Sequence, residues 1–198
     1  MDLIELGEWY HSGLFGPCGE QRLDINYQEA LECFIKIENW TYVGLMYEHG
    51  FGVEQNGQKA LEYFTKAEDW SSIAHLYRDG QAIEKNIDKA IEYLIKVKNW
   101  IALATMYLYG VDVERNGQKA IEYFTAAKDW YSIARMYRDG EAIEPDGVKD
   151  VEYFIRAVEE NHSETAAVDL IIMYEQGIGV EKNEVKAAYW RKIVDDWQ

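Results

Sequence analysis

Five glutamates and four tryptophans recur at intervals of thirty residues, and they are the side chains best placed to do chemistry. The glutamates are Glu32, Glu62, Glu92, Glu122 and Glu152, and the tryptophans are Trp40, Trp70, Trp100 and Trp130. A row of carboxylates attracts a basic ligand over long range, and Trp is enriched in protein interfaces. The predicted partner-binding residues are therefore the five glutamates together with Trp70, Trp100 and Trp130.

Both sets also have a structural interpretation, which the sequence leaves open. Each indole can cover the junction between two neighbouring helices, since large aromatic side chains are usually well buried. Four of the glutamates have a basic residue at i+4, the spacing of a helical ion pair. These pairs are Glu32–Lys36, Glu62–Lys66, Glu92–Lys96 and Glu152–Arg156. Glu122 has Ala126 at that position and no such partner.

Candidates for catalysis are few. None of the four histidines, at positions 11, 49, 75 and 162, has another His or Cys at a zinc-binding spacing. Cys18 and His11 could act as nucleophile and base, but the Gly-Pro loop around Cys18 is poorly suited to hold that geometry. No glycine-rich phosphate loop ending in Lys-Ser or Lys-Thr occurs. We expect no enzyme activity, no metal and no cofactor, and an enzyme or small-molecule binder using the Cys18 loop is the less favoured alternative.

The charge balance bears on partners. The chain has 36 acidic and 20 basic side chains and a formal net charge of −16. Nucleic acid phosphates would be repelled, so the charge favours a basic protein partner, although it also serves solubility alone. No apolar run is long enough to span a membrane, and the N-terminus has no basic start before an apolar stretch. We expect a cytoplasmic protein without membrane contact.

The elements that must position these residues are short helices, two in each thirty-residue unit. Asn56 and Asp69 are N-cap residues by type and place. Ala60 and Phe64 then lie on one apolar stripe, and Gly80 ends the second helix as a left-handed stop. A small residue recurs three places before the repeated Tyr and would let two helices approach closely. It is Gly44, Ala74, Ala104 and Ala134.

We predict a single repeat domain over residues 1–198. Residues 1–26 are an N-terminal half-repeat with an inserted loop, and residues 27–146 are four thirty-residue helix pairs. Residues 147–182 are a longer repeat, and residues 183–198 are a C-terminal capping helix. The surplus of the longer repeat is expected between its two helices, around Glu159 to Thr165.

The segment from Tyr174 to Trp190 reads YEQGIGVEKNEVKAAYW, and residues 47–60 read YEHGFGVEQNGQKA. Both strongly resemble the Sel-one-like repeat, which is related to the tetratricopeptide repeat. The resemblance covers essentially the whole chain, although the middle repeats are about six residues shorter than is usual in the family. It implies an all-α fold, an α-solenoid that winds as a right-handed superhelix of helix–turn–helix repeats.

The resemblance also implies a function. Related proteins act as adaptors, as effectors and as immunity proteins that neutralise a toxin. In related arrays the first helices of the repeats line the concave face, which would place the five glutamates along a groove. We therefore expect a protein–protein interaction scaffold for a basic partner, with a cognate bacterial toxin as one candidate. The alternative is a general adaptor that binds a peptide.

Overall fold

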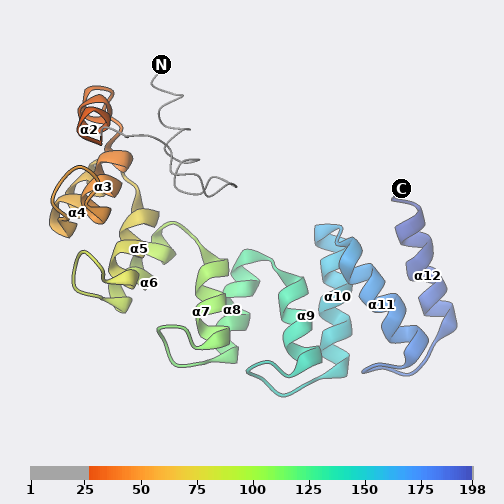
Figure 1. The fold of residues 1–198 in the computed structure, drawn as a ribbon. Helices are drawn as coiled ribbons and strands as arrows, with labels where there is room; N and C mark the ends of the chain where they lie inside the picture. Colours follow the sequence, from red (N-terminus) through yellow and green to blue (C-terminus); the bar gives the residue numbers. More distant parts are fainter. Residues whose placement is uncertain (1–26, 198) are drawn as a thin grey trace, which may run out of the picture. The chain divides into compact units, whose positions relative to one another are not determined.

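The computed structural model describes residues 27–197, which form eleven α-helices and no strand (Figure 1). This confirms the all-α prediction. The described chain divides into two compact units, one ending at Val97 and the other beginning at Lys98. The first unit contains α2 (Tyr27–Lys36), α3 (Trp40–His49), α4 (Gly57–Lys66), α5 (Trp70–Asp79) and α6 (Ile87–Lys96). The second contains α7 (Trp100–Tyr109), α8 (Gly117–Ala127), α9 (Trp130–Asp139), α10 (Gly147–Asn161), α11 (Glu164–Gln176) and α12 (Glu184–Asp195).

The predicted N-caps are confirmed. The side chain of Asn56 accepts a hydrogen bond from the backbone N–H of Lys59 at 3.0 Å, and Asp69 accepts one from Ser72 at 3.0 Å. Each bond satisfies an amide that has no partner inside the helix. Helices of about ten residues are marginal alone, so these caps and the packing between helices determine where each helix begins.

The glycine stops are confirmed as well. Gly80 and Gly110 end α5 and α7 in the left-handed conformation, with φ of 67° and 70°. The loop after Gly80 returns to the helix it left, because the backbone N–H of Asn86 donates to the carbonyl of Tyr77 at 2.8 Å. This short closed loop joins α5 to α6 as an antiparallel hairpin.

Within each unit, the most extensive helix contacts join a helix that begins with Trp, or α11, to the helix after it. These pairs are α3–α4, α5–α6, α7–α8, α9–α10 and α11–α12. The small residues allow the close approach that the sequence predicts: a Cβ atom added to Gly44 in α3 would lie 2.6 Å from the Phe64 ring in α4. Ala104 and Ala134, at the same position, are fully buried.

The longer repeat differs from the prediction. Its additional residues are mostly helical, since α10 runs for 15 residues to Asn161 and α11 for 13 residues from Glu164. Only His162 and Ser163 separate the two helices, with His162 in the left-handed conformation and Ser163 as the N-cap of α11. The surplus, which was expected between the two helices, therefore lies mostly in the helices themselves, at the end of α10 and the start of α11.

In the part of the chain that the structure describes, none of the helices is long and apolar enough to cross a membrane.

Candidate protein-binding surface

Three aromatic rings stack in each thirty-residue repeat. In the first unit, the Tyr93 ring of α6 lies parallel to the Trp70 indole of α5, with 6.0 Å between centroids and 9° between planes. On its other side it stacks on Tyr77, also in α5, at 6.1 Å and 7°. The rings therefore join the first and last turns of one helix to the middle of the next. This confirms that the repeated Trp covers a junction between helices.

The same stack occurs in three other repeats. Their members are Trp40–Tyr63–Tyr47, Trp100–Tyr123–Tyr107 and Trp130–Tyr153–Tyr137. Centroid distances range from 5.5 Å between Tyr47 and Tyr63 to 6.2 Å at Trp100 and Trp130. Stacked aromatic pairs contribute about 0.5–1.5 kcal/mol beyond their buried area. The four stacks are therefore a substantial part of the packing between helices.

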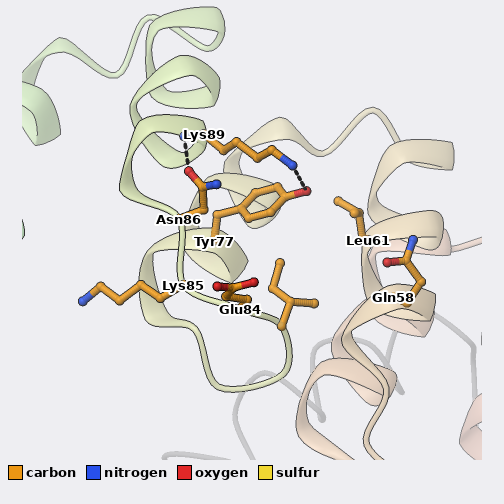
Figure 2. A pocket seen from close by; sticks show the side chains of 8 residues that line it. Gln58, Leu61, Tyr77, Glu84, Lys85, Asn86 and Lys89 are labelled. Atoms are coloured by element: carbon orange, nitrogen blue, oxygen red, sulfur yellow. Dashed lines mark hydrogen bonds between the residues drawn. The ribbon is translucent and has the colours of Figure 1, made fainter.

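Basic side chains lie against the Trp and the second Tyr of a stack. The Nζ of Lys96 lies 3.2 Å from the centroid of Trp70, and the Nζ of Lys89 lies 4.8 Å from the centroid of Tyr77. Both distances are within the range of a cation–π interaction. Figure 2 shows the Tyr77 end, where Lys89 also donates a hydrogen bond of 3.4 Å to the Tyr77 hydroxyl. The exposed pocket in that view has a volume of about 260 Å³ and is lined by Tyr77, Glu84 and Lys89 among others.

The cation over the tryptophan is present in three of the four repeats. Lys66 lies 3.3 Å from the centroid of Trp40, and the Arg156 guanidinium lies 3.8 Å from that of Trp130. At Trp100 the equivalent residue is Ala126, whose side chain is exposed. No cation lies over Trp100 in the part of the chain described, although Lys119 covers Tyr107 at the far end of this stack at 4.6 Å.

The predicted aromatic site residues differ in exposure. Trp70 and Trp100 are half-buried, while only 4% of Trp130 is exposed. The Nε1 of Trp130 donates to Glu160 at 3.0 Å, and Arg156 holds the same carboxylate at 3.0 Å. Trp130 is thus enclosed by its own repeat, whereas Trp100 keeps accessible surface.

The predicted acidic site residues all lie on the surface. Glu32, Glu62, Glu92, Glu122 and Glu152 are exposed, on α2, α4, α6, α8 and α10. The four expected i+4 ion pairs are not formed: among residues 27–197, none of these carboxylates lies within 4.0 Å of a basic group. Lys66 and Lys96 lie over indoles instead, and Arg156 pairs with Glu160. An exposed helical ion pair contributes only about 0.3–0.5 kcal/mol, which is too little to hold these side chains.

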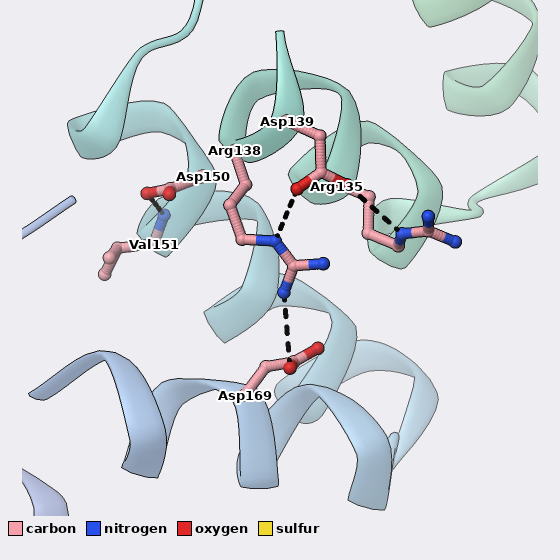
Figure 3. Close-up of polar contacts among 6 residues, drawn as sticks. All are labelled: Arg135, Arg138, Asp139, Asp150, Val151 and Asp169. Atoms are coloured by element: carbon pink, nitrogen blue, oxygen red, sulfur yellow. Dashed lines mark hydrogen bonds and ion pairs between the residues drawn. The ribbon is translucent and has the colours of Figure 1, made fainter. Parts of the chain in front are cut away.

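Two carboxylates are held in environments that favour the protonated form. Asp150, in the first turn of α10, is 1% exposed, and burial raises its pKa to about 6. Figure 3 shows that the nearby Arg138 is engaged elsewhere, by Asp139 at 2.9 Å and Asp169 at 3.2 Å. In α3, burial, together with the negative charges of Asp79 and Asp69, raises the pKa of Glu48 to about 7.

Comparison with known proteins identifies the repeat. The family model described as the Sel1 repeat matches residues 3–37, 41–69, 72–96, 101–129, 131–162 and 167–190, which is most of the chain. The chain belongs to the Sel1 repeat family. Sel1 repeats generally mediate protein–protein interactions, and the family is a non-catalytic interaction scaffold. The comparison with curated proteins finds no match.

Solved structures of Sel1 repeat proteins share this fold. The Sel1 repeat protein from Oxalobacter formigenes is 19% identical, with a TM-score of 0.53, over 98% of this chain and 85% of that one. The protective antigen c5321 of uropathogenic Escherichia coli, which displays an SLR fold, is 17% identical with a TM-score of 0.54. That match covers 98% of this chain and 45% of the antigen. The predicted Sel-one-like solenoid is therefore confirmed.

The Sel1 repeats also contain features that sequence reasoning missed. The covering cations Lys66, Lys96 and Arg156 all follow their Trp by twenty-six residues, a regularity that could have revealed them. His11 and Cys18, the imagined catalytic pair, lie outside the described residues.

Proposed function

We propose that this Sel1 repeat protein is an interaction scaffold that binds a basic partner protein through the exposed glutamates of its first helices. The observation that carries the proposal is that Glu62 and Glu92 in the first unit, and Glu122 and Glu152 in the second, are exposed and have no ion-pair partner among the described residues. Unpaired surface carboxylates attract a basic surface without first breaking an internal contact.

The net charge of −16 supports the same partner chemistry. A field of one sign speeds the encounter with an oppositely charged protein and weakens as salt is added. We therefore expect association that is fast at low ionic strength and slower at high ionic strength. One basic partner of this kind is a cognate toxin that the protein holds inactive. Another is a basic peptide that the protein binds as a general adaptor.

The test compares two quadruple variants with equal change in charge. The first is Glu62→Gln, Glu92→Gln, Glu122→Gln and Glu152→Gln. The matched control is Glu54→Gln, Glu84→Gln, Glu114→Gln and Glu144→Gln, which neutralises four exposed glutamates in the loops. The wild-type chain and both variants are used to capture proteins from the native host at about 0.05 M and about 0.5 M salt.

We expect a basic protein that the wild-type chain and the loop variant retain at low salt and release at high salt. Four exposed charges at about 0.3–0.5 kcal/mol each weaken binding about tenfold in the helix variant. Equal losses in both variants, or a partner that ignores salt, would refute the proposal. If the partner is a toxin, the purified chain should also inhibit its activity at equimolar concentration.

A further inference from the structure

We propose that the exposed part of the Trp100 indole, over which no cation of the described residues lies, is together with the exposed Glu122 a recognition position for one lysine or arginine side chain of the partner. This rests on the proposed function and names the group that the surface accepts.

The other repeats of this chain show what belongs at this position. The indoles of Trp40 and Trp70 are each covered by a lysine, with the ammonium 3.3 Å and 3.2 Å from the ring centroid. Trp130 is covered by an arginine at 3.8 Å. Both kinds of cation therefore fit over the indole in this fold.

Among residues 27–197, no such cation lies over Trp100. Ala126 takes the place of the basic residue, and its methyl group cannot reach across the ring. Ala126 is exposed and Trp100 is half-buried, so this part of the surface is open to solvent. The indole face, which carries the negative potential of the aromatic ring, is available to a cation from another molecule.

Glu122 supplies a counter-charge at the same place. It lies one helical turn before Ala126 in α8 and is exposed. Burial and Tyr107 raise the pKa of Tyr123, and the Glu122 carboxylate raises it further, so its charge acts on the stack that contains Trp100. A cation over Trp100 would therefore meet an aromatic face. It would also feel the long-range field of the Glu122 carboxylate, which has no ion-pair partner among the described residues.

The probe is a capped Gly-Lys-Gly peptide, with Gly-Arg-Gly as a second ligand and Gly-norleucine-Gly as the uncharged control. Binding is followed by the NMR signal of the Trp100 indole N–H, which is assigned by its loss in Trp100→Phe. We expect both basic peptides to shift this signal in a saturable way and to shift the signals of Trp40, Trp70 and Trp130 much less. The norleucine peptide should leave it in place.

Two variants make the test specific. Ala126→Lys places a cation over Trp100 from within the chain and should weaken binding of the lysine peptide about two- to fivefold. Ala126→Gln is the uncharged control and should bind the peptide as the wild-type chain does. Lys96→Ala uncovers Trp70 and should make its indole signal respond to the peptide. This second arm stays informative if Ala126→Lys folds poorly.

Peptides that shift no indole signal, or that bind wild-type and Ala126→Lys equally, would overturn this inference. The host capture experiment separates the two proposals. A salt-sensitive partner with no peptide binding at Trp100 would leave the proposed function intact and refute the recognition position. Peptide binding at Trp100 without a salt-sensitive partner would leave the recognition position intact and refute the proposed function.

Discussion

The ammonium of Lys96 lies 3.2 Å from the centroid of the Trp70 indole, although Glu92 stands one turn away in the same helix. The lysine thus contacts a ring in the preceding helix, and the neighbouring carboxylate has no ion-pair partner among residues 27–197. The contact ties α6 to α5, and it leaves the negative charge of Glu92 exposed. Stability and surface charge therefore come from different side chains of the same helix turn.

Removing the cation should therefore cost stability, while removing the carboxylate should not. We expect Lys96→Met to lower the free energy of unfolding by about 0.5–1 kcal/mol, because it removes a cation–π contact and keeps the apolar stem. Glu92→Gln should change it by less than about 0.3 kcal/mol. Urea unfolding followed by tryptophan fluorescence measures the free energy of unfolding of both variants. An equal loss in the two would contradict a stabilising contact between Lys96 and Trp70.

Asp150 should make stability fall as pH rises. The carboxyl has a pKa near 3.8 when free and about 6 in the folded chain, with burial as the main cause. Between these values the folded state holds a proton that the unfolded state has lost. Stability from this group is therefore fully present below about pH 4 and is lost as pH rises through about 6.

We expect Asp150→Ala to remove this dependence and to raise the free energy of unfolding at pH 7.5 by about 1–2 kcal/mol, since it removes a buried carboxylate. Alanine occupies the same position at Ala60, Ala90 and Ala120 and fits there. Thermal unfolding at pH 4.5 and pH 7.5 tests this, with the exposed Glu152→Ala in the same helix as control. A variant less stable than wild type at pH 7.5 would show that the hydrogen bond from the backbone N–H of Val151 to Asp150 outweighs the cost of burying the carboxylate.

Glu48 should also make stability fall as pH rises, at a higher pH than Asp150 does. Its pKa is raised to about 7 by burial and by Asp79 and Asp69, while its free value is 4.5. Its contribution to stability is therefore lost as pH rises through about 7. We expect Glu48→Gln to flatten the stability profile between pH 5 and pH 8, and Glu54→Gln, in an exposed loop, to leave it unchanged. A profile that keeps its slope in Glu48→Gln would disprove this role.

Gly117 should be intolerant of any side chain. A Cβ atom at this first residue of α8 would lie 2.2 Å from the carbonyl oxygen of Ala142 and 2.5 Å from Ile143. The backbone must shift to relieve this contact, so we expect Gly117→Ala to lower the free energy of unfolding by about 1–3 kcal/mol. Val148→Ala, at a helix start where the side chain is 79% exposed, is the control and should change it by less than about 0.5 kcal/mol. Similar values for the two would contradict the close approach.

The features that could be predicted from the sequence are local or periodic. Asn56 and Asp69 cap helices because a short polar side chain bonds an amide three residues on, and this depends on no other part of the fold. Gly80 ends α5 for an equally local reason. The indole over a helix junction was one of two interpretations of the repeated Trp, because large aromatic side chains are usually well buried.

The features that were missed depend on contacts between helices. Lys66 has Glu62 four residues before it, so the sequence suggests an ion pair, while the indole it covers is twenty-six residues away. The burial of Asp150 has a signal in the sequence, because it stands where other repeats have alanine. Its raised pKa, however, comes mainly from burial, which outweighs the lowering effects of the Val151 N–H and Arg138, and only the folded chain shows this balance.

All layers of an aromatic stack come from one stretch of chain, from Trp70 to Lys96 in the first unit and from Trp100 to Ala126 in the second. A tandem duplication of thirty residues would therefore carry its complete stack with it and need no compensating change elsewhere. A copy with lysine at the position of Lys96 would lengthen the array and stabilise it. A copy with alanine there, as at Ala126, would add a second binding position for a basic side chain. One residue in each repeat therefore decides whether a duplication only extends the array or also enlarges its binding surface.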